Sequence, residues 1–99
     1  MLEINEQTMF SLSPNATLKS VLGKIFFLLD KKNGKQYNLT EMEYELLTMV
    51  RERSRFKEIK EALCREYDGE ANQIDSDVRE YMQSLFEHEL IIVVESVET

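Results

Sequence analysis

The sequence predicts a single α+β domain, and three observations support this fold class. The chain has 99 residues, too few for two independently folding cores, so residues 1–99 are expected to form one domain. Hydrophobic residues make up 42% and charged residues 31%, the balance of a folded globular protein rather than a disordered chain. Strand patterns occupy the first half and helical patterns the second, and this separation is typical of an α+β domain.

The first half of the chain is expected to form a three-stranded antiparallel sheet. Residues Thr8 to Leu12 alternate loosely and stop at a Ser-Pro-Asn turn sequence. Residues Val21 to Asp30 are β-branched and aromatic at their centre, which favours one continuous strand. Asn33-Gly34 can supply the positive φ angles of a tight turn, so Lys35 to Leu39 should run back antiparallel.

The second half is expected to form three helices and a short closing strand. The first helix begins at Thr40 and Glu43, which have the spacing of a capping box. The second runs from about Arg55 to Tyr67 with Ser54 as its cap. The third has apolar residues at steps of three and four, at Ile74, Val78, Tyr81, Met82, Leu85 and Phe86. Leu90 to Val94 then form the closing strand, and the whole order is also that of a winged helix-turn-helix-like domain.

Charge is unevenly distributed and disfavours nucleic acid as the main partner. The net charge is −7: residues 1–50 carry −1, residues 51–60 carry +3 and residues 61–99 carry −9. An acidic protein repels polyanions, although the basic segment at residues 51–60 can steer an acidic partner. The longest apolar runs have five residues, whereas about twenty are needed to span a bilayer, so no membrane partner is expected. A single cysteine and the lack of an export-signal pattern favour a cytoplasmic location.

The residues do not predict an enzyme. His88 lies in a polar stretch at the expected end of the third helix, and Cys64 lies on the second helix, with no third group to complete a nucleophilic site. Cys64 is expected to be a small buried hydrophobe. The three glycines are far apart and form no phosphate-binding loop, and no Cys/His cluster suggests a metal ion. Neither a cofactor nor a metal is expected.

The order of several short motifs resembles the PqqD-like family. The first half contains the motifs Phe10-Ser-Leu-Ser-Pro14, Gly23-Lys-Ile-Phe-Phe-Leu-Leu29 and Gly34-Lys-Gln-Tyr-Asn-Leu-Thr40. The second half continues with Leu46-Leu47, Phe56 to Ile59, Leu63 to Tyr67, Asp77-Val78, Met82, Leu85 and Glu89-Leu-Ile91. The resemblance therefore covers residues 9–94, the expected core of the domain. Thr40 stands where this family usually has Asn, and Arg55 stands where Thr is common.

The resemblance implies a non-enzymatic recognition protein. PqqD-like domains bind the leader segment of a ribosomally synthesised precursor peptide. They present it to a modifying enzyme, such as a radical-SAM protein or the leader peptidase of lasso-peptide biosynthesis. The family's geometry implies that the leader adds as a strand between the third strand and the third helix. The backbone ladder would come from Lys35, Gln36, Tyr37 and Asn38.

The pocket for the leader's apolar side chains is expected on the third helix, at Val78, Tyr81, Met82 and Leu85. Val78 and Leu85 are also expected to contribute to the core. Adjacent residues on a helix point about 100° apart, so one of Tyr81 and Met82 can face the groove while the other faces the core. The sequence leaves open which of the two faces the groove.

Two alternative functions stay open at this stage. A winged-helix DNA-binding protein would insert the third helix into the major groove, but residues 74–88 carry four acids against Arg79 alone. A dimerising adaptor would use a free strand edge or Leu90 to Val94. The expected partners are thus a precursor leader peptide and a modifying enzyme, with a homodimer as the open alternative.

Overall fold

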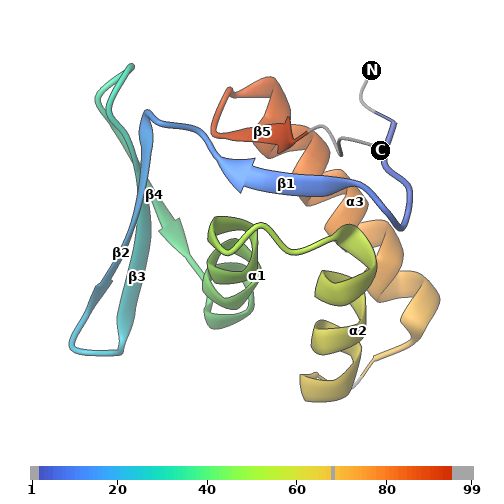
Figure 1. Ribbon diagram of the computed structural model, residues 1–99. Helices are drawn as coiled ribbons and strands as arrows, with labels where there is room; N and C mark the ends of the chain where they lie inside the picture. Colours follow the sequence, from blue (N-terminus) through green and yellow to red (C-terminus); the bar gives the residue numbers. More distant parts are fainter. Residues whose placement is uncertain (1–2, 68, 95–99) are drawn as a thin grey trace.

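The computed structural model describes residues 3–67 and 69–94, and Figure 1 shows how they fold. They form, in chain order, β1 (Met9–Leu12), β2 (Ala16–Val21), β3 (Ile25–Asp30), β4 (Lys35–Leu39), α1 (Glu41–Arg51), α2 (Phe56–Glu66), α3 (Ala71–Glu87) and β5 (Ile91–Val94). Antiparallel strands come first, three helices follow, and a strand ends the described chain. This order confirms the predicted α+β fold class.

The strands belong to two separate antiparallel sheets. β2, β3 and β4 lie side by side in that order, and β1 pairs with β5. In Figure 1 the three-stranded sheet stands at one side of the helices, while β1 crosses over them to reach β5. The β1–β5 register places Phe10 opposite Val93 and Leu12 opposite Ile91. The closing strand is therefore tied to the start of the fold.

The three-stranded sheet contains a strand that the sequence analysis missed. The prediction of one strand from Val21 to Asp30 is wrong, because Leu22 and Gly23 form a turn with φ angles of 55° and 63°. Two successive positive φ angles are the geometry of a type I′ turn, which favours Gly and Asn rather than Leu, so Leu22 concealed the turn. β2 occupies the place beside β3, and the predicted first strand, Thr8 to Leu12, pairs with β5 instead.

The turn between β3 and β4 is held by a buried carboxylate. Asp30 is 3% exposed, and its carboxylate accepts hydrogen bonds from the backbone N–H groups of Lys32 and Asn33 at 3.1 and 3.2 Å. The Asn33 side chain donates a third bond at 2.8 Å and, as the largest influence, helps to lower the pKa of Asp30. Gly34 completes the turn with φ 65°. The predicted antiparallel reversal is confirmed, although of Asn33 and Gly34 only Gly34 has a positive φ.

The helix starts follow local capping. α1 has the predicted capping box, in which the Glu43 N–H donates to Thr40 Oγ1 at 3.1 Å and the Thr40 N–H donates to Glu43 Oε1 at 2.8 Å. At α2 the N-cap is Arg55, whose N–H donates to Glu58 Oε1 at 2.8 Å, so the prediction of Ser54 as the cap is wrong. α3 begins at Ala71, about one turn before its first buried residue, Ile74, and residues 71–73 are exposed.

One core joins both sheets to the helices. Its largest fully buried side chains come from β1, β3, β5 and all three helices: Phe10, Leu28, Leu47, Val50, Phe56, Ile59, Leu63, Met82 and Ile91. The helical members recur at steps of three or four, which turns one face of each helix inward. Packing on this common core sets the position of α3 relative to β4.

Candidate functional site

β4 is an outer strand of the three-stranded sheet. Its register with β3 runs from Asp30–Lys35 to Phe26–Leu39, and no strand of residues 3–67 and 69–94 pairs with its other side. In an antiparallel pair, alternate residues direct their N–H and C=O groups away from the neighbouring strand. β4 thus presents a row of backbone donors and acceptors that a further strand can meet.

A cavity of about 180 Å³ lies between β4 and the second half of α3. Among its lining residues are Tyr37, Asn38 and Leu39 from β4 and Tyr81, Ser84 and Leu85 from α3. His88 also lines it, with its ring edge-on to the Tyr37 ring at 6.4 Å and Nδ1 2.8 Å from the Ser84 carbonyl oxygen. The unpaired side of β4 therefore faces a hollow with a partly apolar wall.

A second cavity, of about 460 Å³, continues along α3 toward the start of α1. Thr40, Met42, Glu43 and Leu46 line it from the α1 side, and Asp77, Val78, Glu80 and Tyr81 line it from α3. Tyr81 and Glu43 line both cavities. We call the two cavities together the β4–α3 groove, and Tyr81 lies where they meet.

Tyr81 is half-buried in this groove, and its environment keeps its hydroxyl neutral. Burial is the larger influence and the Glu43 carboxylate the smaller; both raise the pKa of Tyr81 well above its ordinary value. A tyrosine hydroxyl is already neutral at physiological pH, and these influences keep this one protonated to a higher pH. It can donate a hydrogen bond to a ligand, and the ring offers apolar surface.

The structure places the predicted β4 residues along the outer strand. Lys35, Gln36 and Asn38 are exposed, and Tyr37 is half-buried. Tyr37 and Asn38 line the smaller cavity, whereas Lys35 and Gln36 lie nearer the β3–β4 turn and line neither cavity.

The four predicted α3 residues separate into groove and core. Tyr81 lines both cavities, Val78 lines the larger and Leu85 the smaller, and the last two are also buried core residues. Met82 is fully buried and lines neither cavity. The choice that the sequence left open is thus resolved in geometry: Tyr81 faces the groove and Met82 faces the core.

Several lining residues were not singled out from the sequence. On α3 and just beyond it they are Asp77, Glu80, Ser84 and His88. Elsewhere they include Leu39 at the end of β4, and Met42 and Glu43 on α1. Asp77, Ser84 and His88 lie four residues before, three after and seven after Tyr81, the spacings that share a helix face. Helical periodicity counted from Tyr81 is therefore a signal that could have found them.

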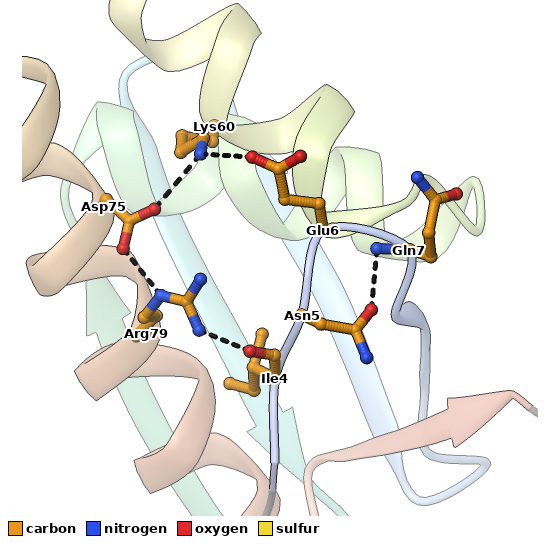
Figure 2. A network of polar contacts seen from close by, with 7 residues as sticks. All are labelled: Ile4, Asn5, Glu6, Gln7, Lys60, Asp75 and Arg79. Carbon is orange, nitrogen blue, oxygen red and sulfur yellow. Dashed lines mark hydrogen bonds and ion pairs between the residues drawn. The ribbon is translucent and has the colours of Figure 1, made fainter.

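The opposite flank of α3 is joined to the N-terminal segment by polar contacts (Figure 2). Asp75 bonds Arg79 Nε at 2.6 Å and Lys60 Nζ at 3.2 Å, and Lys60 also reaches Glu6 at 3.0 Å. Arg79 further donates to the Ile4 carbonyl oxygen, and its guanidinium lies 4.7 Å from the centre of the Phe56 ring. α3 is thus fixed on one flank and borders the groove on another.

A third cavity, of about 900 Å³, lies away from the β4–α3 groove. Gln83, Phe86 and Glu87 line it from α3, and Ile91 and Ile92 line it from β5. β5 is paired with β1 alone among the described strands. This cavity is therefore a distinct surface, and it supplies a comparison site for experiments on the groove.

The described residues also bear on metal binding and membrane insertion. Among residues 3–67 and 69–94, no three His, Cys, Asp or Glu side chains lie close enough together to hold a metal ion. Over the same ranges, no helix combines the length and hydrophobicity that crossing a bilayer requires. Cys64 is a free thiol that is half-buried against the core, so it is more exposed than predicted.

Comparisons with known proteins identify the family. Two solved structures share the fold. The first, "TbiB1 in Complex with the TbiA(beta) Leader Peptide", has a TM-score of 0.74 and 20% identity, and the match covers 89% of this chain and 99% of that one. The second, "Lasso peptide synthetase B1 complexed with the leader peptide", has a TM-score of 0.74 and 19% identity, and the match covers 84% of this chain and 96% of that one. No curated protein sequence matches the chain. The family model described as Coenzyme PQQ synthesis protein D matches residues 26–91. Since that match covers two thirds of the sequence, the chain belongs to the PqqD family.

Proposed function

We propose that this chain binds the leader segment of a ribosomally synthesised precursor peptide as an added strand on β4 and presents it to a modifying enzyme. The observation that carries this proposal is the unpaired side of β4 beside the β4–α3 groove. An extended peptide there would satisfy the outward backbone groups of β4. Its alternate side chains would point toward α3 and give selectivity.

The comparisons support this assignment. Both solved structures described above are, by their names, complexes with a leader peptide. Membership of the PqqD family also confirms the prediction that the chain is not an enzyme.

Within the groove, each predicted residue has a proposed role. The backbone of Lys35, Gln36, Tyr37 and Asn38 would form the ladder with the leader. Val78, Tyr81 and Leu85 would contact its apolar side chains, and Tyr81 would contribute the most because it lines both cavities. Met82 would act from the core by holding α3 at the correct height above the sheet.

The receiving enzyme is proposed to be a radical-SAM protein or a leader peptidase of the lasso-peptide type. Strand addition on β4 involves a short stretch of peptide, because the strand has five residues. The rest of the precursor would stay free to reach the active site of the enzyme.

The charge arrangement of α3 argues against DNA binding. Arg79 is the one basic residue of this helix, and it is engaged with Asp75, Ile4 and the Phe56 ring. The acids Asp77 and Glu80 are exposed on the same helix and would repel phosphates.

Fluorescence anisotropy with a labelled leader peptide tests the proposal. The probe is a synthetic peptide covering the N-terminal half of the short precursor encoded nearest to the gene. We expect saturable binding, slower amide hydrogen exchange over residues 35–39 on binding, and a loss of affinity of about 30-fold or more in Tyr81→Glu. Far-UV circular dichroism checks that the variant is folded.

Phe86→Glu is the matched control, because it puts the same charge on α3 at a partly exposed aromatic residue that lines the 900 Å³ cavity and not the groove. We expect it to bind like the wild type. If Phe86→Glu loses the peptide while Tyr81→Glu keeps it, the groove is not the binding site.

A further inference from the structure

The two cavities of the β4–α3 groove differ in charge. The 460 Å³ cavity has an apolar surface at Met42, Leu46 and Val78, and three acids among its lining residues: Glu43, Asp77 and Glu80. Among the described residues that line it, there is no lysine or arginine. Within the same part of the chain, Glu43 is the one acid that lines the 180 Å³ cavity. Negative charge is therefore concentrated at the end of the groove near α1.

These carboxylates differ from Asp75 of α3 in the groups that surround them. Asp75 forms ion pairs with Arg79 and Lys60. In the described residues, no base lies within ion-pair distance of Glu43, Asp77 or Glu80. Glu43 accepts the Thr40 N–H at 2.8 Å, and Asp77 accepts the Gln73 side-chain amide at 2.8 Å, and both of these donors are neutral.

Negative charge beside an apolar hollow defines a complementary occupant. A long apolar side chain gains by leaving water in the hollow, and a cation at its rim gains from charge-assisted contacts with the nearby carboxylates. Lysine and arginine suit such a rim, because their apolar stems can lie along the hollow while the charged end reaches the acids. An anionic peptide segment would be repelled at the same position.

We propose that the acidic end of the groove selects leader peptides that carry a lysine or arginine close to a large apolar anchor residue. The inference rests on the proposed function, since it assumes that an extended peptide occupies the groove. In a strand, side chains on one face recur every second residue, about 7 Å apart. The basic residue therefore lies two or four positions from the anchor, which contacts Tyr81 and Val78.

A random 12-residue peptide library displayed on phage tests this selectivity. Immobilised wild-type protein should enrich peptides in which Lys or Arg lies two or four positions from an aromatic or large aliphatic residue. Asp77→Asn/Glu80→Gln should enrich the apolar residue without the basic one. Glu43 is left intact because its carboxylate accepts the Thr40 N–H in the capping box of α1. For one enriched peptide, the double variant should lower affinity about three- to tenfold at low salt, and less at high salt.

Glu52→Gln/Glu61→Gln is the matched control, since it removes two exposed charges that line neither cavity. It should retain the wild-type preference. If the wild type enriches apolar peptides with no basic bias, or if the control variant loses the bias equally, the charge inference is wrong while leader binding stands. If every peptide that the wild type enriches also binds Tyr81→Glu, or if the wild type enriches none, both the inference and the proposed function fail.

Discussion

The two flanks of α3 differ in their contacts: one is joined to other segments by polar contacts, and the other borders the groove. On one flank, Asp75 and Arg79 join Lys60 and the N-terminal segment through ion pairs, a backbone hydrogen bond and a contact with the Phe56 ring. On the other flank, Tyr81 borders two cavities and the unpaired side of β4. Both flanks belong to one continuous helix of 17 residues.

This difference indicates how a small domain can keep a binding groove without collapsing into it. The core and the flank of Asp75 and Arg79, here called the polar flank, hold α3 in position. The flank that carries Tyr81, the groove flank, therefore does not need contacts of its own to hold the helix in place. A groove whose walls are positioned from behind is preorganised, and less ordering is then required when a peptide binds. Substitutions on the three surfaces of α3 should therefore separate stability from binding.

The largest expected effect on stability comes from the core side of α3. Met82→Ala should lower the free energy of unfolding by about 2–5 kcal/mol, because Met82 is fully buried and truncation leaves a cavity. Tyr81→Ala should lower it by only about 1–2 kcal/mol, since Tyr81 is half-buried. Urea unfolding of both variants measures the loss of stability, and fluorescence anisotropy with the labelled peptide measures the loss of binding. Equal losses of stability, or loss of binding in folded Met82→Ala alone, would contradict the division of roles between these neighbours.

A smaller effect is expected from the polar flank. Asp75→Asn should lower the free energy of unfolding by about 1–2 kcal/mol at pH 7, because its carboxylate is 26% exposed and joins Arg79 and Lys60. Burial acts to raise the pKa of Asp75, but hydrogen bonds from Arg79 and Lys60 outweigh it and leave the pKa below its ordinary value of 3.8.

The sign of the pH dependence follows from that lowered pKa. The folded state holds the Asp75 proton less tightly than the unfolded state. The stabilisation from the Asp75 carboxylate is therefore complete above pH 3.8 and is lost as the pH falls through the pKa of Asp75 in the folded state. The difference between wild type and Asp75→Asn should be constant from pH 5 to pH 8 and should shrink below about pH 4. Urea midpoints across this range measure it. Asp77→Asn, an exposed carboxylate two residues away, should show almost no loss.

Local features of the fold could be predicted from the sequence, whereas long-range ones could not. The Thr40–Glu43 capping box and the turn at Asn33-Gly34 depend on residues that are neighbours in the chain, and both predictions hold. The turn at Leu22 was missed because leucine is unfavourable at positive φ. The β1–β5 pairing joins segments about 80 residues apart in the sequence, and strand patterns alone carry no information about such a partner.

The candidate site divides in the same way. The apolar periodicity of α3 predicted a face containing Val78, Tyr81, Met82 and Leu85, and all four lie on the inward or groove side. The orientation that buries Met82 and leaves Tyr81 in the groove depends on the rotation of α3 about its own axis as it packs on Leu28 and the other core residues. The hydrogen bond from Arg79 to the Ile4 carbonyl oxygen spans 75 residues, which no local pattern encodes.

The smallest effect is expected where charge joins the β3–β4 turn to the end of α3. Lys32 Nζ lies 2.7 Å from Glu89 Oε2, with side chains 55% and 66% exposed. The hydrogen bond with Glu89 is the main cause that raises the pKa of Lys32 above 10.5, so any stabilisation is present at neutral pH and lost as the pH rises through that higher value. Exposed ion pairs are screened by water and salt and contribute little. Lys32→Met should therefore leave the urea midpoint unchanged within error at pH 7, with or without 0.5 M NaCl. A salt-sensitive loss as large as that of Asp75→Asn would mean that an exposed ion pair outside the Asp75–Arg79 flank also holds the C-terminal end of α3 in place. The contrast between that flank and the rest of the helix would then be wrong.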